Sequence, residues 1–348
     1  MKQLVLRIST VVMALVPFIS IAQLIDSLIL TEDGWIEKMD DYVGVKLSMS
    51  NDTEVFAVET DGLDFEIFPN TTTFGKVHIN YKFISLNLKF APDFFPGNGD
   101  NETKGKTSSF GISANLIFRH WFHNLSYSRV KGFYINNTKD LDPTWVSGDP
   151  YAQVPDLVFK NFEGITGYSF NPKFSVRSIT TQTERQVKSA GSFVPILGYR
   201  YYIIDNRDED ASSSQKSNNF EFVLGVGYHY NFVLKQNFYF SLGVTPGVGY
   251  IFTKLTTRYQ ASDDLETRYN DLISRVEGRG ALGYNSRAFF AGGLIQVTGS
   301  SYKQEGTTAV NTDARVAYQV FIGYRFNAPK RLRENVNQIS KPIKKHPQ

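Results

Sequence analysis

The hydrophobic pattern along the chain has a period of two, and it is clearest between Phe220 and Phe252. Every second residue from Phe220 to Phe232 is apolar, whereas the residues between them are mostly small or polar. After a short polar interruption the same alternation resumes at Phe238. Because successive side chains of a strand point to opposite faces, this pattern predicts a strand, a tight turn and a second strand.

The apolar face of these two strands is ordered along its length, with aromatic residues at both ends and aliphatic residues between them. Two aromatic belts around an aliphatic band are typical of strands that cross a lipid bilayer. The last strand of the chain, around Val316 to Phe326, repeats the alternation. The residues that we assign to an aromatic girdle are Phe220, Phe222, Tyr228, Tyr230, Phe238, Phe240, Tyr250, Phe252, Tyr318, Tyr324 and Phe326.

The whole pattern predicts an all-β fold, a transmembrane antiparallel β-barrel of about twelve strands, in a range of about ten to fourteen. The count would reach an odd number if Phe174 to Thr181 were a strand, but bacterial barrels have an even number. We therefore place the error within Phe174 to Ser192. Tight turns near Lys82, His120, Gln236 and Arg287 alternate with long polar connectors, which predicts short periplasmic turns and long extracellular loops. The long connectors are Asn51 to Thr72, Pro92 to Lys106, Asn137 to Asn161, Asp205 to Asn219, Lys254 to Gly278 and Ser300 to Thr312.

The two ends of the chain differ from the middle. Residues 1–22 have the features of a secretory signal peptide, with Lys2 and Arg7 before a short apolar core and small residues before Gln23. We expect cleavage near Ala22 and residence in the bacterial outer membrane. Residues 23–41 are interpreted as a periplasmic lead-in, residues 42–327 as the barrel, and residues 328–348 as a basic flexible tail.

Composition narrows the possible chemistry. The chain has 348 residues and no cysteine, which excludes disulfides, thiolate metal sites and thiol nucleophiles. The formal net charge is +3, and its excess comes from the tail, which carries six basic residues and Glu334. The body therefore gives no support for nucleic-acid binding. We predict no metal and no cofactor.

Charged residues also occur at positions whose phase points into the barrel, and most of them are basic. One interpretation is a constriction that favours anions. The other is a neutralised network of ion pairs that plugs a narrow barrel, and a twelve-stranded lumen is intermediate between filled and open barrels. These positions are Lys46, Lys76, His78, Lys89, Arg177, Arg200, Glu221, Arg315 and Arg325.

His229 and Ser241 are candidate catalytic residues. If the hairpin closes around Lys235, His229 lies across from Ser241 on the interior face. A Ser–His pair becomes a hydrolase dyad when a third group orients the imidazole. No nucleophile motif surrounds Ser241, so a hydrogen-bonded pair in a polar lumen is the favoured interpretation.

Several short stretches along the chain carry a further signal through their sequences and their order. They are Asn80 to Ser85, Gly105 to Thr107, Lys131 to Tyr134, Asn171 to Ser175, Gln186, and Ser189 to Ser192. These stretches resemble a family of Bacteroidota outer-membrane proteins known as domain of unknown function 4421, and the resemblance covers most of the mature chain. It implies a barrel and no known activity, so it assigns no functional residue.

Three functions agree with these features. The barrel is a structural or narrow-pore protein that passes a small solute, a lipid-active enzyme that uses Ser241 and His229, or a scaffold whose extracellular loops bind a protein partner of unknown identity. An enzymatic role is the less favoured. Outer-membrane lipid and lipopolysaccharide are the expected surroundings.

Overall fold

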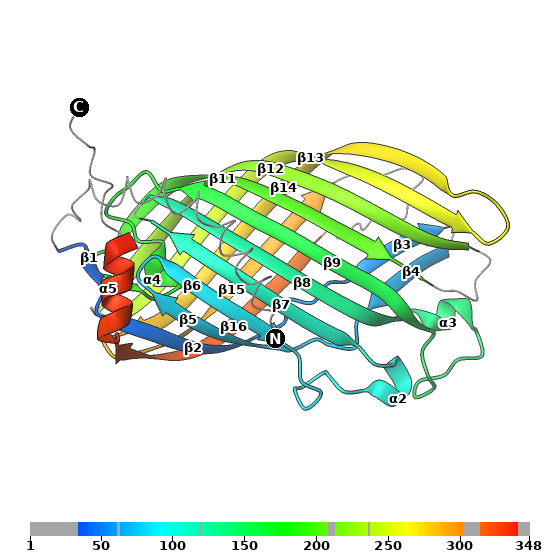
Figure 1. Cartoon of the computed structure of the whole chain (residues 1–348), viewed down its shortest axis with the longest axis horizontal. Helices are drawn as coiled ribbons and strands as arrows, with labels where there is room; N and C mark the ends of the chain where they lie inside the picture. Colours follow the sequence, from blue (N-terminus) through cyan, green and yellow to red (C-terminus); the bar gives the residue numbers. More distant parts are fainter. Residues whose placement is uncertain are drawn as a thin grey trace.

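Twelve strands close into one antiparallel barrel, which confirms the predicted fold class and strand number (Figure 1). The computed structural model describes residues 34–60, 63–118, 120–207, 213–235, 237–301 and 314–339, so the predicted signal peptide and most of the lead-in lie outside the described residues. The barrel strands are β2 (Tyr42–Ser50), β5 (Phe74–Tyr81), β6 (Ile84–Phe90), β7 (Ser108–Ile117), β8 (Trp121–Ile135), β9 (Gln153–Tyr168), β11 (Ala190–Asp205), β12 (Ser213–Leu234), β13 (Phe238–Tyr259), β14 (Leu265–Asn285), β15 (Phe289–Ser301) and β16 (Ala314–Asn327).

The barrel wall is a continuous meander that pairs each strand with its neighbour in the chain, and β16 with β2. Successive partners on the outward face, followed once around the wall, leave β14 at Tyr284 and return to it at Asn270, fourteen residues along the strand. Such a stagger requires strands that tilt by about 35–45° from the barrel axis.

The outer surface of the wall is apolar because the period-two pattern points its large hydrophobic residues outward. Leu224 and Val248, at mid-strand, are 57% and 60% exposed on the barrel surface. Aromatic pairs lie toward both ends of the strands, for example Phe220 with Phe252 and Phe238 with Tyr284. An outer surface of this kind stabilises the fold only when lipid replaces water around it.

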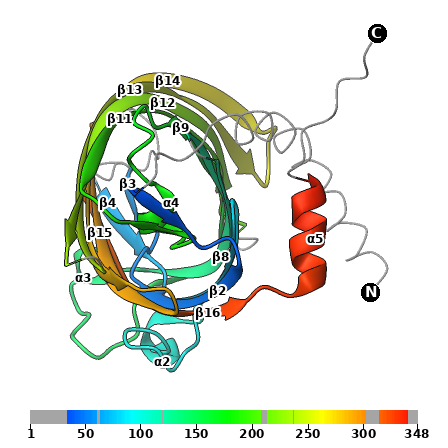
Figure 2. The same cartoon turned by 90° about the vertical axis from the view of Figure 1, so that its left-hand side faces the viewer.

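Two connecting segments, one at each end of the barrel, fold into its interior. Both lie within the ring of strands in the end-on view (Figure 2). At the periplasmic end, residues 171–189 form what we call the plug, which contains α4 (Arg177–Thr180) and β10 (Glu184–Gln186). β10 pairs with β1 (Ile36–Lys38) of the lead-in. At the extracellular end the connector after β2 contains the hairpin of β3 (Phe56–Thr60) and β4 (Leu63–Phe68).

The plug explains the uncertain strand count. The stretch from Phe174 to Ser192 contains one turn of helix and a three-residue strand that does not join the wall. Three expected loops are also shorter than predicted, because β9, β12, β13 and β14 extend farther toward the extracellular side than the pattern indicates. β13 runs to Tyr259 and β14 begins at Leu265, so most of the stretch from Lys254 to Gly278 is strand.

The remaining helices lie outside the lumen. α2 (Asn101–Lys104) and α3 (Thr138–Leu141) belong to extracellular loops (Figure 1). The expected flexible tail begins instead with α5 (Lys330–Ile339), whose Val336 packs against Phe83, Leu116 and Phe118 at the periplasmic end. An apolar contact of this kind gives a basic helix a fixed place at the barrel rim.

An apolar cluster fills the lumen toward its extracellular end. Phe159, Ile251 and Ile273 are at most 1% exposed, and they belong to β9, β13 and β14. Ile67 of the hairpin packs against the same cluster, so the connector after β2 covers the cluster on its extracellular side. β4 is also fixed to β8 through the pairing of Ile67 with Ile135.

We expect Gly132→Ala to destabilise the barrel by about 1–3 kcal/mol, because Gly132 adopts a φ of +87° at a register shift between β8 and β9. A Cβ there would lie 2.1 Å from the carbonyl oxygen of Lys106. The measurement is the urea midpoint of the heat-modifiable gel shift. Gly278→Ala is the matched control, since its Cβ would meet only the Val297 carbonyl oxygen at 3.9 Å. Equal midpoints for the two variants would contradict the assignment.

Candidate functional site in the barrel lumen

The predicted opposition of His229 and Ser241 is wrong. Ser241 pairs with Asn231, and His229 pairs with Gly243. The hairpin has a three-residue turn, because Leu234 pairs with Phe238, and this moves every partner by two residues from the predicted register. His229 lies over Gly243, where a Cβ would be 2.0 Å from its Nδ1, and its Nε2 lies 3.2 Å from Thr245 Oγ1.

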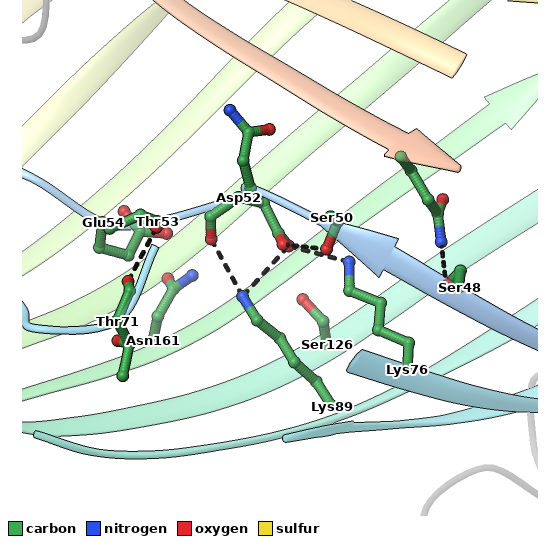
Figure 3. A network of polar contacts seen from close by, with 12 residues as sticks. Ser48, Ser50, Asp52, Thr53, Glu54, Thr71, Lys76, Lys89, Ser126 and Asn161 are labelled. Atoms are coloured by element: carbon green, nitrogen blue, oxygen red, sulfur yellow. Dashed lines mark hydrogen bonds and ion pairs between the residues drawn. The ribbon is translucent and has the colours of Figure 1, made fainter. Parts of the chain in front are cut away.

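The most charged part of the lumen is organised around residues 51–55, which we call the inward segment (Figure 3). Asp52 lies between two lysines of the wall: its Oδ2 is 2.9 Å from Lys76 Nζ and 3.1 Å from Lys89 Nζ. Lys89 also donates to the backbone carbonyl of Asp52 at 3.0 Å. β5 and β6 are thus tied to the inward segment.

Glu54 makes the corresponding contacts with two arginines. Its Oε2 lies 3.1 Å from Arg200 Nη2, and its Oε1 lies 3.4 Å from Arg315 Nη1. Arg200 belongs to β11 and Arg315 to β16, which are separated by four strands one way around the wall and six the other way. Glu54 therefore bridges two nearly opposite sides of the lumen.

Both carboxylates of the inward segment are ionised in this environment. Burial alone would raise the pKa of Glu54, but Arg315 and Arg200 outweigh it and lower the pKa to about 2. Burial likewise opposes ionisation of Asp52, and Lys89 and Lys76 hold its pKa well below the ordinary range. The side chains are only 17% and 28% exposed, so these ion pairs are partly shielded from solvent.

A layer of neutral hydrogen bonds lies beside this charged group. Ser48 Oγ is 2.8 Å from His78 Nε2, and Asn87 Oδ1 is 2.5 Å from His78 Nδ1. Gln319 donates to Ser48 at 2.6 Å, and Asn87 donates to Ser113 at 2.9 Å. His78 is fixed by partners on both ring nitrogens, which suits a structural role better than proton transfer.

The plug is held at the periplasmic side by a buried ion pair and by hydrogen bonds to several wall strands. Arg177 Nη1 lies 3.2 Å from Glu184 Oε1, and their side chains are 4% and 9% exposed. Arg177 also donates to the carbonyl oxygen of Ile117 at 2.6 Å. Further ties come from wall side chains: Lys46 donates to Thr180, Asn231 to Ser175, Asn285 to Glu184, and Arg325 to Gln182.

A small cavity lies between the plug and the wall. A cavity of about 10 Å³, room for about one water molecule, lies beside Ser178, Asn231 and Tyr239. The plug, the inward segment and the apolar cluster all lie within the ring of strands.

The structure places the interior residues chosen from the sequence as follows. Eight lie on wall strands with their side chains toward the lumen, whereas Arg177 lies on α4 of the plug. Glu221 pairs with Arg275 at 2.6 Å, which leaves it outside the inward-segment group. The predicted extracellular loop from Asn51 to Thr72 includes Asp52 and Glu54, which lie in the lumen instead. Their positions continue the inward phase of Lys46, Ser48 and Ser50, and that parity was a usable signal.

The described residues contain no cluster of three or more His, Cys, Asp or Glu side chains that could hold a metal ion. In the same part of the chain, no helix has the length and apolar character needed to span a membrane.

The chain belongs to the family described as "Domain of unknown function (DUF4421)", whose sequence profile matches residues 29–326. No curated protein matches it. Among solved structures it is similar to OmpT of Vibrio cholerae, at 10% identity and a TM-score of 0.28, over 86% of this chain and 100% of that one.

Two further solved structures are similar. One is the outer-membrane protease OmpT of Escherichia coli, at 9% identity and a TM-score of 0.32, over 83% of this chain and 96% of that one. The other is the copper transporter OprC, at 11% identity and a TM-score of 0.34, over 83% of this chain and 43% of that one. These similarities concern the barrel and assign no activity to this chain.

We expect Glu54→Gln to lower the free energy of unfolding by about 2–3 kcal/mol at neutral pH. Because the native pKa of Glu54 is lowered from 4.5 to about 2, the carboxylate's contribution is fully present above about pH 4.5 and is lost as the pH falls toward 2. Urea midpoints of the two proteins, measured from pH 8 to pH 2.5, should keep a constant difference down to about pH 5 and then converge. Convergence already at pH 6 would contradict the proposed bridge.

Proposed function

We propose that this protein is a gated outer-membrane pore for small anionic solutes, and that the structure is its closed state. The observation that carries the proposal is the placement of Asp52 and Glu54, which are held by four basic side chains from four separate wall strands. The proposal includes export by the N-terminal signal peptide and insertion in the bacterial outer membrane.

The contacts of the inward segment suit a reversible closure. It follows β2 directly, and Thr53 Oγ1 donates to the carbonyl oxygen of Thr71 at 3.0 Å, which ties the two legs of the connector together. Glu54 bridges opposite walls through contacts at 3.1 and 3.4 Å. Movement of Glu54 out of the lumen therefore breaks the bridge across it. Its ion pairs are partly exposed, and pairs of this kind contribute less than fully buried ones and exchange with solute ions.

The charge of the wall selects the solute class. Without the inward segment, Lys76, Lys89, Arg200 and Arg315 would face the lumen with two fewer carboxylates to neutralise them. A constriction lined by basic side chains attracts anions and repels cations. The carboxylates of the inward segment occupy the places that a phosphate or carboxylate solute would take.

A second candidate is a permanently closed structural barrel, and the plug is the observation that favours it. Arg177 and Glu184 form an ion pair that is almost fully buried, and removal of one partner from such a pair is strongly destabilising. If the plug never moves, the inward segment stabilises the barrel and nothing passes through it.

Conductance of refolded protein in a planar bilayer distinguishes the two candidates. We expect the wild type to be silent. Loosening both barriers, with Asp52→Asn and Glu54→Gln in the inward segment and Arg325→Gln at the plug contact, should give steady channels that prefer chloride to potassium. Adding Arg200→Gln and Arg315→Gln should reduce that preference, because it removes two of the four cations that face the solute.

The control for added flexibility is Asp263→Asn, an exposed carboxylate in the loop between β13 and β14, which should leave the wild-type silence unchanged. Each protein is first shown to be folded by its heat-modifiable migration. Silence from a folded variant with both barriers loosened would reject the pore and favour the structural barrel. Channels that prefer potassium would reject the anion assignment.

A further inference from the structure

A basic pair lies on the outside of the barrel, at the extracellular edge of its apolar band. Arg129 of β8 and Lys160 of β9 are directly opposed in the strand register, and their phase points outward. On the same strands, the preceding outward positions toward the periplasm are Tyr127 and Phe162, which are also directly opposed. The two rows are two residues apart, which is about 7 Å along the strands.

On β8 and β9 the aromatic pair Tyr127 and Phe162 ends the apolar band on its extracellular side, because the next outward pair is basic. The ladder partners farther along the wall are also aromatic, with Tyr201 of β11, Phe220 of β12 and Phe252 of β13, and the strand tilt places each of them somewhat closer to the extracellular end. The outward positions beyond these aromatic residues are polar on most of these strands, with Asn218 on β12 and Lys254 on β13. Aromatic girdles lie at the boundary between hydrocarbon and headgroups. Arg129 and Lys160 therefore lie at the level of the outer-leaflet headgroups.

Directly opposed like charges destabilise a strand pair, so two opposed cations are more stable when an anion lies between them. The barrel contains a second pair that shows the usual solution. Lys254 of β13 and Arg268 of β14 are also directly opposed and point outward, and Lys254 Nζ lies 2.6 Å from the carboxylate of Glu266. There the chain itself supplies the negative charge.

Within the described part of the chain, Arg129 and Lys160 have no such carboxylate. The nearest outward acidic residue on these strands, Asp156, pairs with Lys131 at 2.9 Å instead. Lys131 is the next outward position of β8 beyond Arg129, so it adds a third cation to the same surface. Three cations and one carboxylate thus leave a net positive surface at a fixed depth of the bilayer.

We propose that Arg129 and Lys160, with Lys131 beside them, bind a phosphate group of an outer-leaflet glycolipid. The guanidinium of Arg129 offers paired donors that match phosphate oxygens, and Lys160 supplies a second charge across the ladder. Phe110 of β7, which pairs with Arg129, extends the apolar surface for the acyl chains together with Tyr127 and Phe162. A free phosphate ion would gain nothing from that surface, which favours the lipid as the occupant.

The test uses the full mature chain in nanodiscs that contain diphosphorylated lipid A, with native mass spectrometry to count bound lipid. We expect Arg129→Gln with Lys160→Gln to lower the affinity for the lipid, measured from its occupancy, about thirtyfold, since each of the two basic residues near an anionic surface contributes about 1 kcal/mol. Lys254→Gln with Arg268→Gln is the matched control and should leave occupancy unchanged. Arg129→Lys with Lys160→Arg keeps both charges and should retain most of the binding.

Three results would overturn the proposal. One is wild-type occupancy in the double glutamine variant, provided that its urea midpoint shows a folded barrel. Another is equal binding of dephosphorylated lipid A, which would assign the site to sugar or acyl chains. The last is full displacement of the lipid by millimolar inorganic phosphate, which would make the site one for a free anion. None of these results depends on whether the lumen conducts.

Discussion

The fold depends on neutralising charge inside a closed ring of strands. Twelve strands with a stagger of fourteen residues enclose a space wider than the wall side chains alone can fill. Basic residues on β5, β6, β11 and β16 point into that space, and charges in a partly shielded interior must be paired. The chain meets this requirement with its own connector, because Asp52 and Glu54 enter the lumen and hold four of those cations. The filling of the lumen thus depends on ion pairs as well as on packing.

The wall was predictable because its pattern is local. Alternation from Phe220 to Phe252 reports the strand, the face and the bilayer at once, and an even strand number corrected the count. The interior was less predictable because its contacts join distant parts of the chain. Arg200 and Arg315 lie 146 and 261 residues from Glu54, and no local pattern indicates such pairings. For the connector after β2, the parity of Asp52 and Glu54 with Lys46 was the sequence signal that indicated side chains facing the lumen.

Each feature that the sequence did not predict has its own physical cause. A single turn of helix and a three-residue strand are too short to show a period, so the plug between Asn171 and Ser189 had no signature. The register of the hairpin depends on where its turn is centred, and a centre one residue beyond Lys235 moves each partner by two. This difference separates His229 from Ser241 and removes the geometric basis of a dyad. Beyond the aromatic girdle both faces of the strands are polar, so no apolar alternation indicates how far each strand extends.

The inner and outer surfaces of the wall follow the same rule with different partners. Inside, opposed basic side chains meet carboxylates of the inward segment, as Glu54 does between Arg200 and Arg315. Outside, Lys254 and Arg268 meet Glu266, whereas Arg129 and Lys160 meet no carboxylate within the described residues. A strand ladder tolerates opposed cations where an anion is at hand, and at the level of the headgroups the bilayer supplies phosphates. Arg129 and Lys160, which have no carboxylate beside them among the described residues, are therefore the outward pair that a lipid phosphate would neutralise.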